Sequence, residues 1–130
     1  MAKEKISTAK APEAIGPYSQ GVASGGLLFL SGQIPIDPAT GEVERGGIEA
    51  EARRVLTNLK AVLEAAGSGL DDVVKTTVYL TDLAGFADVN RVYGEFFAEP
   101  YPARATVEVG GLPRGVGVEM DLVAVVGGKG

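Results

Sequence analysis

Residues 73–81 read VVKTTVYLT, a run of β-branched and aromatic residues that is typical of a strand. Apolar residues at helical spacing precede this run over residues 48–66, and Gly67 stands where a helix C-cap is expected. A second helical pattern covers residues 86–97 and ends before Pro100 and Pro102. A strand between two helices predicts a protein of the α+β class.

Four further strands are predicted on either side of this central unit. They lie at residues 18–24, 27–32, 104–109 and 118–126. Gly25-Gly26 joins the first two as a hairpin, and residues 34–47 and 110–117 are rich in turn-forming Gly and Pro. The resulting order is ββ–α–β–α–ββ, in which two helices can cover only one face of the sheet.

The last predicted strand is apolar on both faces, but the two helices of one chain can cover only one of them. Residues 122–126 read LVAVV and are apolar at every position, which is typical of a strand covered on both faces, and residues 27–30 (LLFL) show the same pattern. A neighbouring copy of the chain is the simplest cover for the second face, so the sequence favours an oligomer. The alternative is a strand end tucked under a loop.

Composition restricts the chemistry that the chain can perform. Its 130 residues predict a single domain, residues 1–130, with a frayed tail at residues 127–130. There is no Cys and no His, which excludes thiol nucleophiles, disulfides, Cys/His zinc sites and imidazole bases. Proton transfer must therefore use carboxylates, Tyr, Lys, hydroxyl groups, backbone groups or water.

Charge and hydropathy restrict the partners. Twelve basic and 17 acidic residues give a net charge of −5, which disfavours general binding to nucleic acid. The polar N-terminus has no apolar segment of the kind that directs secretion, and no apolar run reaches the ~20 residues of a membrane span. We expect a cytoplasmic protein without a membrane partner.

Arg104 is the residue most informative about function. It lies in residues 101–109, YPARATVEV, which otherwise predict a half-buried strand. A guanidinium group in such a strand carries a permanent charge and needs an anionic partner. The partner is either a carboxylate of the protein, such as Glu108 or Glu119, or the carboxylate of a ligand held by a two-point contact.

Each of the other polar candidates also has a structural interpretation. Glu119 and Asp121 lie on one face of their predicted strand. This face is either exposed to solvent, or it places a carboxylate near Arg104 that orients or deprotonates water. Tyr18, Ser31 and Asn90, taken singly, read as a core aromatic residue, a turn hydroxyl and a surface amide.

Five motifs in one order along the chain carry a family resemblance. They are IGPYSQ (15–20), SGQIP (31–35), VKTTVYL (74–80), PAR (102–104), and LP (112–113) with VE (118–119). Together they resemble the RidA family, also called YjgF/YER057c/UK114, over nearly the whole chain. The resemblance implies a chorismate-mutase-like α+β fold with a single mixed sheet and two helices packed on one face. It also implies a homotrimer with ligand clefts between subunits.

The resemblance further implies an activity. Members of this type are enamine/imine deaminases, which hydrolyse 2-aminoacrylate and 2-imino acids such as 2-iminobutanoate and 2-iminopropanoate to 2-keto acids and ammonia without a cofactor or a metal. Two other functions remain open: a non-catalytic sensor of small carboxylates, and an endoribonuclease or translation inhibitor.

The family's site residues fall on matching positions of this chain. Its carboxylate-binding arginine falls on Arg104, and its water-handling acid falls on Glu119. The implied substrate-binding residues are Tyr18, Ser31, Gly32, Asn90, Arg104 and Thr106. Thr106 stands where some members carry Cys, so the thiol chemistry of those members is absent here.

Overall fold

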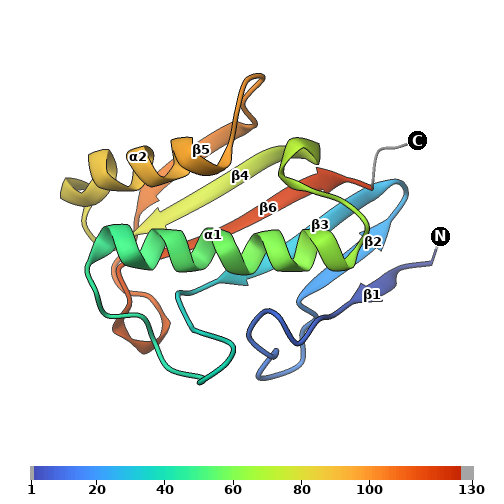
Figure 1. Cartoon of the computed structure of the whole chain (residues 1–130), viewed down its shortest axis with the longest axis horizontal. Coiled ribbons are helices and arrows are strands. Elements are labelled where there is room, and N and C mark those ends of the chain that lie inside the picture. The colour runs from blue at the N-terminus through green and yellow to red at the C-terminus, as the bar shows by residue number, and fades with distance from the viewer. Residues whose placement is uncertain (1, 127–130) are drawn as a thin grey trace.

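The sheet of this protein contains six strands, and two α-helices pack on it (Figure 1). The computed structural model describes residues 2–126. The strands are β1 (Glu4–Ile6), β2 (Gly21–Ser24), β3 (Leu27–Gln33), β4 (Val73–Leu80), β5 (Ala103–Glu108) and β6 (Val118–Val125), and the helices are α1 (Ile48–Ala65) and α2 (Phe86–Phe96). The strand order is β1-β2-β3-β6-β4-β5, in which β4 and β5 are parallel and the other pairs antiparallel. This arrangement confirms the predicted α+β class and the single mixed sheet.

Most predicted elements begin and end within a residue or two of the observed ones, but the N-terminal region differs. Strand β1 was not predicted, because its short polar sequence carries no alternating apolar pattern; it pairs with β2 through Ile6 and Gly21. The strand expected at residues 18–24 begins only at Gly21, since Tyr18 N donates to Gly16 O (2.9 Å) in a turn. The predicted frayed tail at residues 127–130 lies outside the described residues.

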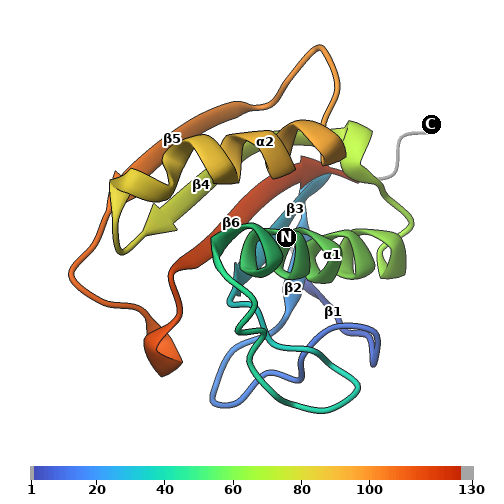
Figure 2. The same ribbon diagram turned by 60° about the vertical axis from the view of Figure 1, so that its left-hand side comes forward.

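Both helices lie on one face of the sheet (Figures 1 and 2), and the core fills the space between these layers. Alternate residues of β6, namely Val118, Met120, Leu122 and Ala124, are buried on this face. Helix α1 contributes Val55, Leu56, Leu59, Val62 and Leu63. No helix of residues 2–126 is long and apolar enough to cross a membrane.

The C-terminus of α1 ends as the sequence predicted. Gly67 has a φ of 76°, a left-handed value that favours glycine. Gly67 N donates to Glu64 O (3.0 Å) and Ser68 N donates to Leu63 O (2.9 Å), the two bonds of a Schellman motif. This cap sends the chain back towards the sheet to begin β4.

The second face of the sheet is open in the single chain. Leu27 and Val125 are cross-strand neighbours and are each 37% exposed, and Phe29, opposite Val123, is 46% exposed. The expectation that residues 122–126 are covered on both faces is therefore not met within one chain, because both helices lie on the other side. We call Leu27, Phe29, Val123 and Val125 the open apolar face.

Truncating the core should cost more stability than truncating an exposed apolar residue. Leu56 is fully buried between α1 and the sheet, so Leu56→Ala should lower the free energy of unfolding by about 2–5 kcal/mol. Leu83 is 45% exposed, and Leu83→Ala should change it by about 0.5 kcal/mol or less. Urea denaturation monitored by circular dichroism measures both values, and equal losses would contradict this assignment of the core.

Candidate functional site

Arg104 projects from β5 towards α2. Thr76 of β4 pairs with Arg104, and its side chain is buried on the helix-covered face, so the Arg104 side chain lies on that face too. The guanidinium carbon lies 4.7 Å from the centroid of the Tyr93 ring and 5.5 Å from that of Phe86. Tyr93 Oη in turn shares a 2.8 Å hydrogen bond with Thr76 Oγ1. The ring that supports the guanidinium group is thus itself fixed.

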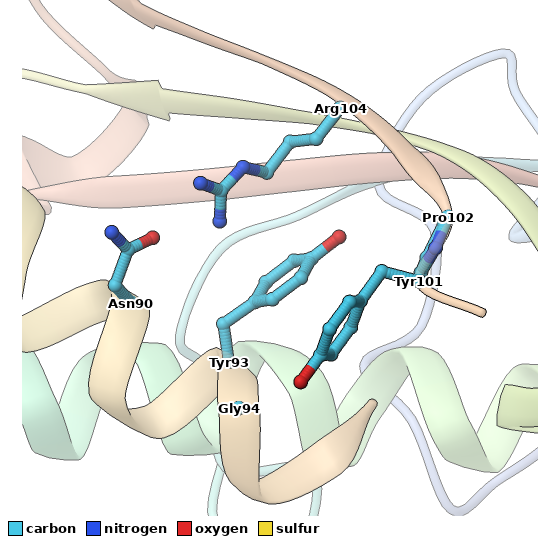
Figure 3. Close-up of a pocket in the computed structure, with 6 residues that line it drawn as sticks. All are labelled: Asn90, Tyr93, Gly94, Tyr101, Pro102 and Arg104. Carbon is cyan, nitrogen blue, oxygen red and sulfur yellow. The ribbon is translucent and has the colours of Figure 1, made fainter. Parts of the chain in front are cut away.

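A pocket of about 440 Å³ opens beside this guanidinium group. Its lining residues are Asn90, Tyr93, Gly94, Tyr101, Pro102 and Arg104. In Figure 3 the guanidinium group of Arg104 and the side-chain amide of Asn90 point towards the same space. A planar cation and an amide facing one cavity form a suitable receptor for a small carboxylate.

No carboxylate of residues 2–126 forms an ion pair with Arg104. Glu108, one of the two expected partners, instead accepts a hydrogen bond from Leu83 N (2.9 Å). Glu119, the other, lies on the opposite face of the sheet. The ion-pair interpretation is therefore wrong for the single chain. The prediction that residues 101–109 form a half-buried strand is also wrong in its burial, because β5 is an edge strand and most of its residues are exposed.

Glu119 belongs to a second pocket, of about 390 Å³. This pocket is lined by Tyr18, Ser31, Gly32, Ile34, Pro113 and Glu119. Gly32 permits the carboxylate to approach the backbone of β3, because a Cβ atom at position 32 would lie 3.0 Å from Glu119 Cδ and closer still to Oε2. Ser31 Oγ donates to Ser19 O (2.6 Å), and the hydroxyl group of Tyr18 accepts a bond from Ile15 N (3.4 Å).

The environment of Glu119 favours its protonated form. Burial raises the pKa of Glu119, and the negative charge of Asp121 raises it further. The stability contributed by this raised pKa is present at acidic pH and is lost as the pH rises through the folded-state value. A carboxyl group with a raised pKa can both give and take a proton closer to neutral pH.

The predicted site residues therefore form two groups in one chain. Arg104 and Asn90 line the pocket beside α2, whereas Tyr18, Ser31, Gly32 and Glu119 line the pocket on the opposite face. Thr106 is half-buried on β5 and is not among the residues lining either pocket. The expected proximity of Glu119 to Arg104 is not formed within the chain.

Sequence reasoning missed Tyr93 and Tyr101 as parts of the site. Tyr93 fitted the apolar stripe of its helix, although it follows Asn90 by three residues and so shares a helix face with it. Tyr101 directly precedes the PAR motif, which was the available signal. Among residues 2–126, no group of three or more acidic side chains is arranged to hold a metal ion.

Comparisons with known proteins identify the family. The family model described as endoribonuclease L-PSP matches residues 8–126. The chain therefore belongs to this family, which is the RidA or YjgF family.

Three relatives illustrate the range of names within it. A RutC family protein of Pyrococcus abyssi is 56% identical over 124 residues, covering 95% of this chain and 98% of that protein. A protein of Bos taurus named 2-iminobutanoate/2-iminopropanoate deaminase is 46% identical over 127 residues, covering 98% and 93%. The crystal structure of E. coli TdcF with bound serine has a TM-score of 0.89 and 46% identity, covering 94% of this chain and 98% of that one.

The close approach of the Glu119 carboxylate to Gly32 can be tested by substitution. Gly32→Ala should displace the Glu119 carboxylate but lower the free energy of unfolding by only about 1 kcal/mol or less, because the group in the way is the end of a flexible side chain. Gly69→Ala is the matched control, since a Cβ atom there meets nothing within 4 Å. Urea denaturation gives the stability, and NMR titration of the Glu119 carboxyl group reports its displacement. A folded Gly32→Ala protein in which the Glu119 carboxyl group titrates as in wild type would contradict the close approach.

Proposed function

We propose that the protein is an enamine/imine deaminase that hydrolyses 2-aminoacrylate and 2-imino acids, such as 2-iminobutanoate and 2-iminopropanoate, to 2-keto acids and ammonia. The observation that carries the proposal is the guanidinium group of Arg104, held over Tyr93 beside a pocket and not paired with a carboxylate of residues 2–126. The deaminase name of the Bos taurus relative and the serine bound to TdcF, itself a small amino acid, support this substrate class.

The active unit of the proposal is a homotrimer with sites between subunits. Arg104 and Glu119 lie in pockets on opposite faces of one sheet, so a site that uses both requires a neighbouring chain. The open apolar face and the exposed edge strand β5 offer surfaces for that contact. Both are the kind of surface that oligomers cover.

The proposed reaction begins with the substrate carboxylate bound to the fork of Arg104, which fixes the adjacent C=N carbon. 2-Aminoacrylate enters the reaction as its imine tautomer, 2-iminopropanoate. Protonated Glu119 gives its proton to the imine nitrogen, and the resulting carboxylate takes a proton from water as the water oxygen bonds to the carbon, which yields a tetrahedral amino alcohol. Glu119 then gives this proton to the amine, the C–N bond breaks to release ammonia, and the hydroxyl proton returns to Glu119 as the carbonyl of the 2-keto acid forms. Water is the only co-reactant, so the proposal includes no cofactor. We expect the protein to act in the cytoplasm.

Two other functions remain as rivals of this proposal. The family description includes the word endoribonuclease, but a net charge of −5 disfavours contact with a polyanion. A sensor of small carboxylates would use Arg104 without a competent acid. The half-buried Glu119 with a raised pKa favours turnover over sensing.

The role of Arg104 can be tested by substitution. Arg104→Ala should lower kcat/KM about 100-fold or more, because two charge-assisted hydrogen bonds of about 1.5–3 kcal/mol each are lost. Arg104→Lys should retain part of the activity, since it keeps the charge without the planar fork. The assay generates 2-aminoacrylate with a serine dehydratase and follows pyruvate release.

The control for this test is Arg53→Ala, which removes an exposed arginine that pairs with Glu95 (2.8 Å) on the helices. It should leave turnover unchanged. Near wild-type turnover by assembled Arg104→Ala would remove Arg104 from the mechanism. Wild-type protein that binds 2-keto acids without accelerating hydrolysis would favour the sensor.

The oligomeric state provides a second test. Light scattering at micromolar concentration should give three times the mass of the chain. Phe29→Glu places a charge on the open apolar face and should shift the population towards monomer, whereas Lys60→Glu, on the exposed side of α1, should not. A monomeric wild-type protein would contradict a site shared between subunits.

A further inference from the structure

The segment between β1 and β2, residues 7–20, carries Tyr18 into the Glu119 pocket, although it contains neither helix nor strand. The backbone polar groups of such a segment must find partners outside a regular hydrogen-bond ladder. Four hydrogen bonds to the backbone of residues 8–12 come from one side chain, that of Gln20, which directly precedes β2. Gln20 is therefore the group through which this part of the chain is held.

The side-chain amide of Gln20 uses both of its polar atoms, and the residue is only 4% exposed. Its Oε1 accepts a hydrogen bond from Thr8 N (2.7 Å), and its Nε2 donates to Pro12 O (2.7 Å). Nε2 also lies 3.1 Å from Thr8 O and 3.3 Å from Ala11 O, so its two N–H groups are shared among three carbonyl oxygens. The three acceptors around Nε2 and the donor at Oε1 fix the orientation of the amide.

The main chain beside this amide is tied to β3. Gln20 O accepts a hydrogen bond from Ser31 N (3.0 Å), and Ser31 Oγ donates to Ser19 O (2.6 Å). Gln20 thus joins two parts of the chain, with residues 8–12 held by its side chain and β3 held by its main chain. Only residues 13–18 lie between these two points of attachment.

These contacts shorten the loop that carries Tyr18. Without them the loop would run from the end of β1 to Ser19, about twice the length of residues 13–18, and a longer loop loses more conformational entropy when it is ordered. Tyr18 itself is 52% exposed at the edge of the pocket, so contacts of its own side chain do little to hold it. Its placement depends on the hydrogen bonds that Gln20 makes.

We propose that Gln20 is a positioning residue of the shared site: it holds residues 8–12 and thereby fixes Tyr18 at the Glu119 pocket in the orientation that binds substrate. These hydrogen bonds lie within one chain and are buried, so a neighbouring subunit that supplies Arg104 to this pocket leaves them intact. A group that is fixed before binding reduces the free-energy cost of association. The catalytic consequence rests on the proposed deaminase function, whereas the attachment of residues 8–12 does not.

The kinetics of Gln20→Met test this role in the full-length protein, with pyruvate release from 2-aminoacrylate as the assay. Methionine fills a similar volume but makes no hydrogen bonds of this kind, so KM should rise about five- to tenfold, equivalent to the loss of about one hydrogen bond to the substrate. The value of kcat should stay within about twofold of wild type, because Arg104 and Glu119 are unchanged. A folded Gln20→Met protein that has the wild-type KM, or that loses kcat alone, would overturn the proposal.

The matched control is Ser68→Ala. Ser68 Oγ also ties distant parts of the chain together, through hydrogen bonds to Asp72 Oδ2 (2.9 Å) and Val125 O (3.0 Å), but Ser68 lines neither pocket. Ser68→Ala should therefore leave KM unchanged. An equal rise in KM in this variant would show a general effect of lost side-chain hydrogen bonds and would contradict a specific role of Gln20.

A double-mutant cycle tests whether Gln20 acts through Tyr18. Tyr18→Ala should raise KM by itself, and Gln20→Met should then change KM by less than about twofold in the Tyr18→Ala protein. Effects of the two substitutions that multiply in full would show that Gln20 acts by another route, and would overturn the proposal.

Hydrogen exchange supplies a readout that requires neither activity nor a variant. The Thr8 amide, bonded to the buried Oε1 of Gln20, should exchange at least about 100-fold more slowly than in an unstructured peptide. Exchange of Thr8 at the unstructured rate in wild type would overturn the inference even if Gln20→Met fails to fold.

Ligand binding separates this inference from the proposed function. Wild-type protein with no deaminase activity would refute the proposed function alone. The five- to tenfold effect of Gln20→Met should then appear in the Kd of pyruvate, measured by titration calorimetry, and equal Kd values for wild type and the folded variant would overturn the inference.

Discussion

The alternation of side chains across a sheet is the constraint on which this structure depends. Arg104 pairs with Thr76, which is buried under α2, whereas Glu119 pairs with Tyr79 on the opposite face. Ala105 and Val107, the apolar residues of β5, pair with Thr77 and Tyr79 and so lie on the same face as Glu119. The register of β5 therefore keeps Arg104 and Glu119 on opposite faces of one chain. The proposed trimer resolves this conflict by supplying the second group from a neighbour.

The support of Arg104 shows how a charged group is oriented without an ion pair to a carboxylate of residues 2–126. The buried Tyr93 presents the face of its ring to the guanidinium group, and Thr76 fixes the ring through its hydroxyl group. A cation held over an aromatic ring keeps its hydrogen-bond donors free for an anion. Placing this arrangement on an edge strand leaves it accessible both to a ligand and to a neighbouring chain.

The opposite face of the sheet holds a carboxyl group whose ionisation is disfavoured by burial. Glu119 is half-buried against Gly32, and a side chain at position 32 would force its carboxylate to move. The raised pKa of Glu119 weakens the folded state as the pH rises. Such arrangements are concentrated at functional sites, where a shifted pKa is useful.

The sequence by itself determined the α+β class, both helices and five of the six strands, because β-branched runs, helical periodicity and Gly67 at its cap are local patterns. It also determined the family, because the motifs occur in a fixed order along the chain. It predicted candidate site residues but could not divide them between two faces. The sequence did not predict strand β1, because its pairing with β2, and not its own short polar sequence, makes it a strand. Only the tertiary structure decided that β6 lies between β3 and β4 and that β5 forms an edge. Strand order depends on contacts between segments far apart in the chain, and so does the separation of Arg104 from Glu119.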